Sequence, residues 1–150
     1  MVAVSHEQTI QLMNIVKDIE IAAPLEIAFE ALLAEMGPEG QMPDGTSLSM
    51  KIEPWPGGRW YRDLGDNKGH LWGHVQVIKP PTVIEVCGPM FMSYAVASHV
   101  QYRLTAEGNI TRIKLTHTAF GLIPDDLHGG VNEGWAHKLK RVAELAASMR

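Results

Sequence analysis

The sequence predicts an α+β fold in which helices lie against one face of a curved antiparallel sheet. Three observations favour this fold. A short helical pattern follows the first strand, alternating segments separated by turn residues fill the middle of the chain, and a long amphipathic segment ends it. The length of 150 residues is typical of one domain over residues 1–150, and we expect residues 1–10 to form a flexible N-terminal extension.

The first two elements follow from residues 12–37. Ile15, Ile19 and Ile21 fall on one face of an extended chain, which predicts a β-strand over 12–21. Pro24 suits the first position of a helix, because its missing N–H would have no partner there. The apolar stripe of this helix consists of Leu25, Ala28, Phe29 and Leu32. Gly37 ends the pattern, and the Gly- and Pro-rich segment 36–47 is predicted to be a loop.

Residues 48–119 are typical of an antiparallel meander, with turn residues at 56–58, 65–67, 80–81 and 107–109. Apolar and polar residues alternate in two segments on either side of the last turn, so each strand has a dry and a wet face. The dry face of this predicted hairpin carries Tyr102, Leu104, Ile113, Leu115 and, by the same parity, His117.

From about Val131 onward the apolar spacing becomes helical. The stripe contains Val131, Trp135, Leu139, Val142, Ala146 and Met149, with Leu145 at its margin. The opposite side carries Glu133, His137, Lys140, Arg141 and Glu144. Gly129, Gly130 and Gly134 each cost roughly 1 kcal/mol against alanine inside a helix, so the first turns are predicted to be weakly helical or unusually closely packed.

Composition excludes several classes of protein. A net charge of -4 is wrongly signed for nucleic-acid binding, and the single Cys87 cannot form an internal disulfide or a cysteine zinc site. The absence of a long apolar run and of a secretory signal predicts a cytoplasmic protein without a membrane span. His70 and His74 would stand about 13 Å apart in a strand, too far to share one ion. We therefore expect no metal and no cofactor.

No nucleophile, zinc-protease, dinucleotide or P-loop motif is present, so the sequence assigns no catalytic residue and leaves open whether the protein is an enzyme.

Five segments, in their order, resemble the activator of heat-shock-protein-90 ATPase homologue family of the START-like (SRPBCC) superfamily, which includes the birch pollen allergen. They are residues 22–29, 56–60, 73–81, the hairpin 100–117, and Gly134-Trp135 at the start of a helix. The resemblance implies a helix-grip fold, with a seven-stranded antiparallel sheet curled around a long C-terminal helix and two short helices between the first two strands. Members of the superfamily often have a cavity between helix and sheet, and the resemblance therefore implies a ligand such as a lipid, a hormone or a polyketide. It implies no fixed reaction.

These observations predict a protein that binds a largely apolar small molecule in a cavity of roughly 300 to 1,000 Å³ between the C-terminal helix and the sheet. Aromatic walls with a few polar groups are typical of such cavities. The predicted ligand-binding residues are Trp60, Trp72, Met92, Tyr102, His117, Trp135 and Leu139. Each of these side chains also suits a packed core, where His117 would bond a backbone carbonyl or a tyrosine such as Tyr102.

Several alternatives stay open at this point. One alternative is an enzyme that acts on an enclosed substrate with His117 as acid or base. Another is an interaction module that docks on a chaperone. Assembly into a homodimer is a separate open alternative. The segment 87–94, rich in Met and aromatic residues, forms a pocket lid, part of the core or a subunit contact. Arg59 and Arg62 fall on opposite strand faces, so at most one of them meets an anionic ligand.

Overall fold

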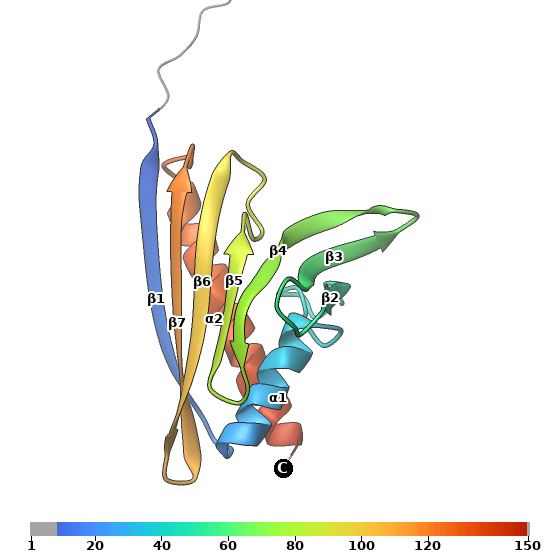
Figure 1. The fold of residues 1–150 in the computed structure, drawn as a ribbon, viewed down its shortest axis with the longest axis vertical. Coiled ribbons are helices and arrows are strands. Elements are labelled where there is room, and N and C mark those ends of the chain that lie inside the picture. The colour runs from blue at the N-terminus through green and yellow to red at the C-terminus, as the bar shows by residue number, and fades with distance from the viewer. Residues whose placement is uncertain (1–8, 150) are drawn as a thin grey trace, which may run out of the picture.

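A computed structural model describes residues 9–149 of the chain (Figure 1). Its elements are β1 (Gln11–Ile21), α1 (Leu25–Met36), β2 (Met50–Ile52), β3 (Arg59–Gly65), β4 (Lys68–Lys79), β5 (Val83–Gly88), β6 (Val96–Glu107), β7 (Ile110–Gly121) and α2 (Leu127–Ser148). Of the predicted N-terminal extension, only Thr9 and Ile10 are described, and both are exposed. The remainder of that prediction lies outside the described residues.

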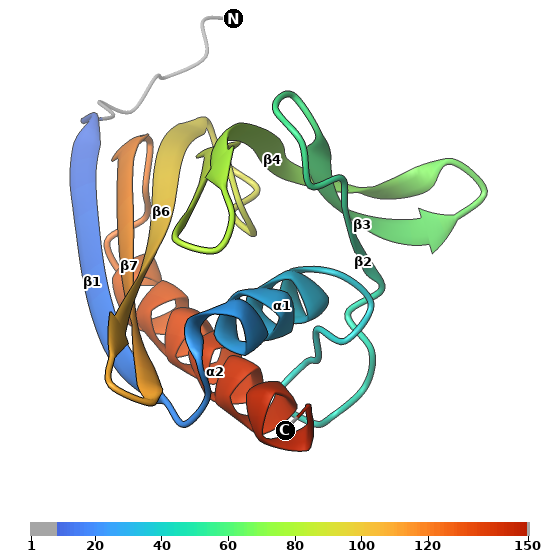
Figure 2. The same ribbon diagram turned by 60° about the horizontal axis from the view of Figure 1, so that its bottom comes forward.

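The strands form one antiparallel sheet in the order β1-β7-β6-β5-β4-β3-β2. The sheet curls over both helices, and α2 runs along its concave face, as Figure 2 shows. This arrangement confirms the predicted helix-grip fold. One detail differs: residues 22–49, all of which are described, contain one helix instead of two. After Gly37 the Gly- and Pro-rich chain makes turns, which confirms the predicted loop.

The long hairpin of β6 and β7 shows why alternation predicts the sheet correctly. Tyr102 pairs with Leu115 and Leu104 with Ile113, and all four side chains are buried on the concave face. His117 lies opposite Val100 on the same face and is completely buried. The parity argument for an inward His117 is therefore confirmed, and it places an imidazole directly under α2.

Helix α2 buries the predicted stripe from Val131 to Ala146, whereas Met149 follows the helix and is half-buried. The helix begins at Leu127, before the glycine pair 129–130. Lys138 and Leu145 also lie on the buried face. His137 and Arg141, predicted to lie on the solvent-exposed side, contact the loop after α1 instead. Nε2 of His137 lies 3.1 Å from the Gln41 carbonyl, and Arg141 donates to the Glu39 carbonyl. The loop after α1 is thus fastened across the outer side of α2.

Helix α1 is tied to the far end of the sheet. The indole Nε1 of Trp60, on β3, donates a 2.7 Å hydrogen bond to the carbonyl of Met36, in the last turn of α1. This bond satisfies one of the carbonyls that a helix end leaves without an intrahelical partner. As a result α1, the loop that follows it, β3 and α2 surround one corner of the core.

Candidate ligand-binding site

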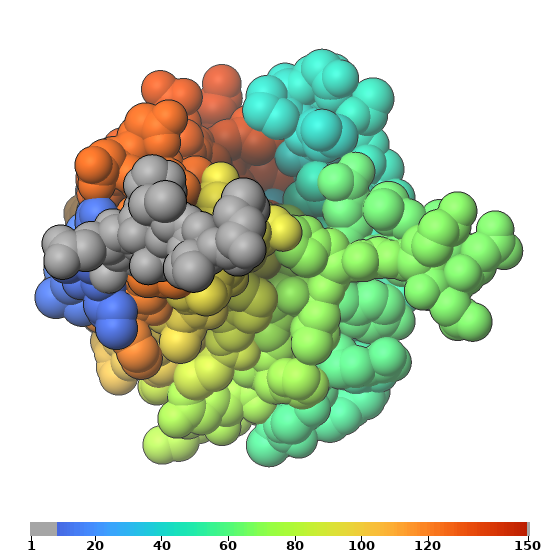
Figure 3. All heavy atoms as spheres, turned by 90° about the horizontal axis from the view of Figure 1, so that it is seen from above, coloured from blue at the N-terminus to red at the C-terminus, as the bar shows by residue number. Residues whose placement is uncertain are grey.

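A cleft of about 390 Å³ opens at this corner, between the first half of α2 and the β3–β4 end of the sheet. We call it the α2 cleft. Figure 3 shows the loop after α1 in cyan, α2 in orange to red and the β3–β4 hairpin in green on one side of the molecule. The lining residues are Gln41, Met42, Pro43, Leu48, Arg62, His70, Trp72, Phe91, Gly130, Glu133, Gly134, His137 and Lys138.

An unbroken row of aromatic rings runs from the cleft into the core. Trp60 meets Trp72 at 5.0 Å between ring centroids, Trp72 meets Phe91 at 5.3 Å, and Phe91 meets Trp135 at 5.2 Å. Tyr102 and His117 both lie edge-on against Trp135. Such edge-to-face and tilted contacts are favourable beyond the area they bury. The row brings together five of the seven predicted ligand-binding residues.

Only one of the seven, Trp72, lines the α2 cleft. The other six do not line it and are buried in the core; they are Trp60, Met92, Tyr102, His117, Trp135 and Leu139. Phe91 of the segment 87–94 also lines the cleft, whereas its neighbours Met90 and Met92 fill the core. The core role predicted for this segment is therefore confirmed for Met90 and Met92, and a lid role stays a prediction.

A buried ion pair lies at the cleft wall. Nζ of Lys138 donates to Oε2 of Glu35 over 2.9 Å, and the two side chains are 6% and 1% exposed. The same ammonium lies 5.5 Å from the Trp60 ring centroid and 5.0 Å from that of Trp72, within cation–π range. Burial raises the pKa of Glu35, and the charge and hydrogen bond of Lys138 oppose that rise.

Six buried side-chain polar atoms have no hydrogen-bond partner among the described residues. They are Nε of Arg62, Nε1 of Trp72, Oε1 of Glu35, the Tyr102 hydroxyl, Nε2 of His117 and Oγ of Ser98. Native proteins leave few such atoms unpaired, and water or a ligand commonly supplies the missing partner. Of these residues, Arg62 and Trp72 line the cleft itself, and their unpaired atoms are both buried N–H donors.

The two arginines of β3 do lie on opposite faces. Arg59 is exposed, forms an ion pair with Glu53 at 2.9 Å and stacks over Tyr61. Arg62 is half-buried, and within the described chain no carboxylate lies within ion-pair distance of it. Its Nη2 lies 4.0 Å from the Met42 sulfur. Arg62 is therefore the arginine that faces the cleft.

His117 has a defined partner, although not one that the sequence suggests. Nε1 of Trp135 donates to Nδ1 of His117 over 2.8 Å, in place of a bond to a backbone carbonyl or Tyr102. Since Nδ1 accepts this bond, neutral His117 carries its proton on Nε2. Burial lowers the pKa of the imidazole to about 4, so near neutral pH it offers a donor and not a basic lone pair.

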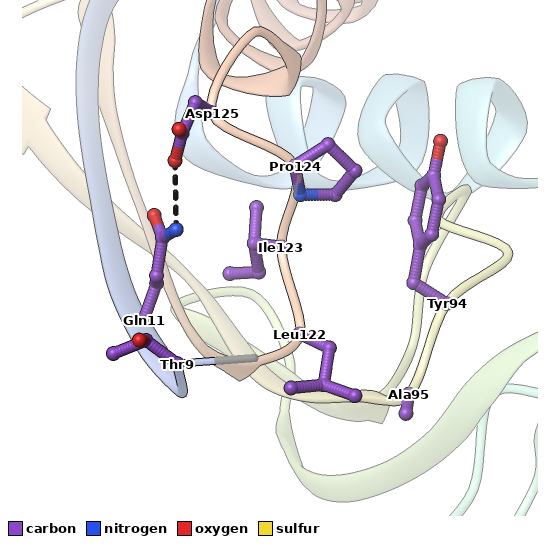
Figure 4. Close-up of a pocket in the computed structure, with 8 residues that line it drawn as sticks. All are labelled: Thr9, Gln11, Tyr94, Ala95, Leu122, Ile123, Pro124 and Asp125. Carbon is purple, nitrogen blue, oxygen red and sulfur yellow. Dashed lines mark hydrogen bonds between the residues drawn. The ribbon is translucent and has the colours of Figure 1, made fainter. Parts of the chain in front are cut away.

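A larger but more open hollow, of about 660 Å³, lies near the N-terminal end of α2 (Figure 4). Gln11 and Asp125 border it and share a 2.7 Å hydrogen bond, while Tyr94 stands on the other side and is 48% exposed. None of the unpaired buried polar atoms found in residues 9–149 lines this hollow. The α2 cleft is therefore the better candidate site.

Sequence reasoning missed two of the groups at the site, Glu35 and Lys138. Helical spacing could have identified both as buried residues. Lys138 follows Trp135 by three residues and Val131 by seven, so it lies on the buried stripe of α2. Glu35 follows Leu32 by three and lies on the buried stripe of α1. Charged residues at such positions are rarely buried without a partner.

Two further findings concern only residues 9–149. They contain no group of three or more His, Cys, Asp or Glu side chains placed to hold a metal ion. Neither of the helices in this part of the chain is long and apolar enough to cross a membrane.

The curved sheet around α2, with an aromatic cleft beside it, defines an α+β protein of the helix-grip class. Residues 23–147 match the family described as "Activator of Hsp90 ATPase homolog 1-like protein", and the chain belongs to this family. The family resemblance predicted from the sequence is thereby confirmed. Comparison with curated proteins finds no match.

Solved structures share the fold at low sequence identity. A protein from Rhizobium leguminosarum is 19% identical, with a TM-score of 0.75 over 95% of this chain and 99% of that one. CalU16 from Micromonospora echinospora is 18% identical, with a TM-score of 0.63 over 93% and 85% of the two chains. Ara h 8.0201 is 16% identical, with a TM-score of 0.65 over 92% and 99%. At these identities the comparisons establish the shared fold.

Proposed function

We propose that this protein binds a small, largely apolar molecule in the α2 cleft. The observation that carries the proposal is an aromatic wall next to unpaired buried donors. Trp72 and Phe91 line the cleft, and neither Nε of Arg62 nor Nε1 of Trp72 has a hydrogen-bond partner within residues 9–149. Small-molecule sites typically combine a mostly apolar lining with a few polar groups, and 390 Å³ lies within their usual size range.

Binding of apolar probes tests this function. Naphthalene methanol is titrated into the protein while tryptophan fluorescence is recorded, because Trp72 lines the cleft and its emission should respond to a bound ring. The melting temperature should rise with probe concentration, since a ligand that binds only the folded state stabilises it. Neither a fluorescence change nor a rise in melting temperature at saturating probe would count against the proposal.

The enzyme alternative has weaker support. A general base needs a free lone pair, and near neutral pH the Trp135 hydrogen bond occupies the lone pair on Nδ1 of His117 while Nε2 holds the proton. Docking on a chaperone is supported by the family description alone. A homodimer and a cytoplasmic location stay predictions, which light scattering and cell fractionation test.

A further inference from the structure

The charges around the α2 cleft define what kind of small molecule fits it. Arg62 is half-buried in the cleft wall, and its guanidinium has no carboxylate partner among residues 9–149. Burying part of a charge without a counter-ion is costly, so partly buried arginines normally meet an anion. The outward Arg59 on the same strand has such a partner in Glu53.

Two further inner polar groups of the cleft wall are donors, while the Glu35 carboxylate at this wall already has Lys138 as its cation. Nε1 of Trp72 is a buried N–H without an acceptor in the described part of the chain, and an indole can only donate. Nζ of Lys138 uses one of its three N–H groups for Glu35. The carboxylate at the cleft, Glu133, is exposed, so solvent screens its repulsion toward an anion.

We infer that the ligand is an amphipathic carboxylate, whose anionic group pairs with Arg62 and accepts a hydrogen bond from Trp72 while its apolar body packs on Trp72 and Phe91. The planar guanidinium presents parallel donors that match the two oxygens of a carboxylate. This inference rests on the proposed function, since it adds the chemical class of the ligand to the same cleft.

Matched probes separate the anionic group from the apolar body. Naphthalene carboxylate and naphthalene methanol share one ring system and differ only in the charged group. We expect calorimetric titration to give a lower Kd for the carboxylate. The substitution Arg62→Gln should raise the carboxylate Kd roughly tenfold to a hundredfold, the usual effect of losing a charge-assisted hydrogen bond, and leave the alcohol nearly unchanged.

Two variants control for folding and for general charge. Arg59→Gln removes an exposed arginine from the opposite face of β3 and should leave both Kd values unchanged. Arg62→Lys keeps the charge without the planar fork, and its carboxylate Kd should lie between those of the wild type and Arg62→Gln. Each variant is used after its thermal unfolding confirms a folded protein.

The results distinguish this inference from the proposed function. Equal affinity of the wild type for both probes, or an equal loss for both in Arg62→Gln, overturns the carboxylate while leaving apolar binding intact. Failure of both probes to bind overturns both proposals.

Discussion

The indole of Trp135 and the imidazole of His117 form a hydrogen-bonded pair in the centre of the core, with Nε1 of Trp135 2.8 Å from Nδ1 of His117. Both residues are completely buried, and their rings meet nearly at right angles. The pair joins the middle of β7 to α2. It fixes the imidazole tautomer, which decides what His117 offers to any molecule that reaches it.

The first prediction concerns that tautomer. Nitrogen NMR of the imidazole should show neutral His117 with its proton on Nε2, because the Trp135 N–H needs an acceptor at Nδ1. In Trp135→Phe this constraint is lost, and the fraction with the proton on Nδ1 should rise. A dominant Nδ1–H form in the wild-type protein would contradict the hydrogen bond.

The second prediction is a pH dependence of stability. Burial lowers the pKa of His117 in the folded protein from 6.5 to about 4. The unfolded chain therefore takes up a proton between these values while the folded protein does not, so the free energy of unfolding falls as pH drops from 6.5 to 4. The loss from this group is about 3 kcal/mol.

Urea unfolding at a series of pH values measures this loss. In His117→Asn, whose amide oxygen keeps an acceptor near the Trp135 N–H, the same pH interval should cost distinctly less stability than in the wild type. Identical pH profiles for the two proteins would show that His117 does not titrate as its burial requires.

Much of the fold could be predicted from the sequence, because a two-residue period fixes which side chains face inward. Ile15, Leu115 and His117 illustrate this: parity alone placed them on the concave face. The helical period likewise predicted the face of α2 that carries Trp135. Both patterns work because the direction of a side chain within one strand or helix follows from its position along that element.

The site was less predictable, because it depends on contacts between elements. The pairs Trp135–His117 and Lys138–Glu35 join residues 18 and 103 positions apart, and no local pattern relates them. Whether an aromatic residue lines a cavity or fills the core depends on how volumes fit together in space. For this reason Trp72 and Tyr102, equivalent in the sequence argument, differ in the structure.

The third prediction concerns the buried ion pair. Lys138→Met leaves the Glu35 carboxylate buried without its cation and should cost roughly 3–5 kcal/mol near neutral pH. Adding Glu35→Leu should restore most of this loss, since an apolar pair needs no desolvation of charge. Lys51→Met is the matched control: its pair with Asp63 is 59% and 34% exposed, and its loss should stay below about 1 kcal/mol.

The pH dependence of this loss provides a further check. Without Lys138 the two effects that most oppose the raised pKa of Glu35 are gone, so the folded protein holds the proton more tightly than the unfolded chain. The destabilisation of Lys138→Met relative to the wild type should therefore shrink as pH falls toward 4.5, where the unfolded carboxyl also becomes protonated. Chemical unfolding of both proteins at each pH measures it, and a difference independent of pH would contradict a buried, ionised Glu35.

The last prediction uses the glycines at the start of α2. Gly130 lines the α2 cleft and Gly129 does not, although a Cβ at either position would meet no atom of the described residues within 4 Å. Gly130→Phe should therefore fold and gain helix propensity. Its ring should occupy space at the cleft and so block the binding of naphthalene methanol. Gly129→Phe has the same propensity change and should bind the probe as the wild type does. Fluorescence titration of the two variants locates the site: equal binding by both would mean that the probe occupies another part of the protein, because only the ring at position 130 competes for the space beneath α2.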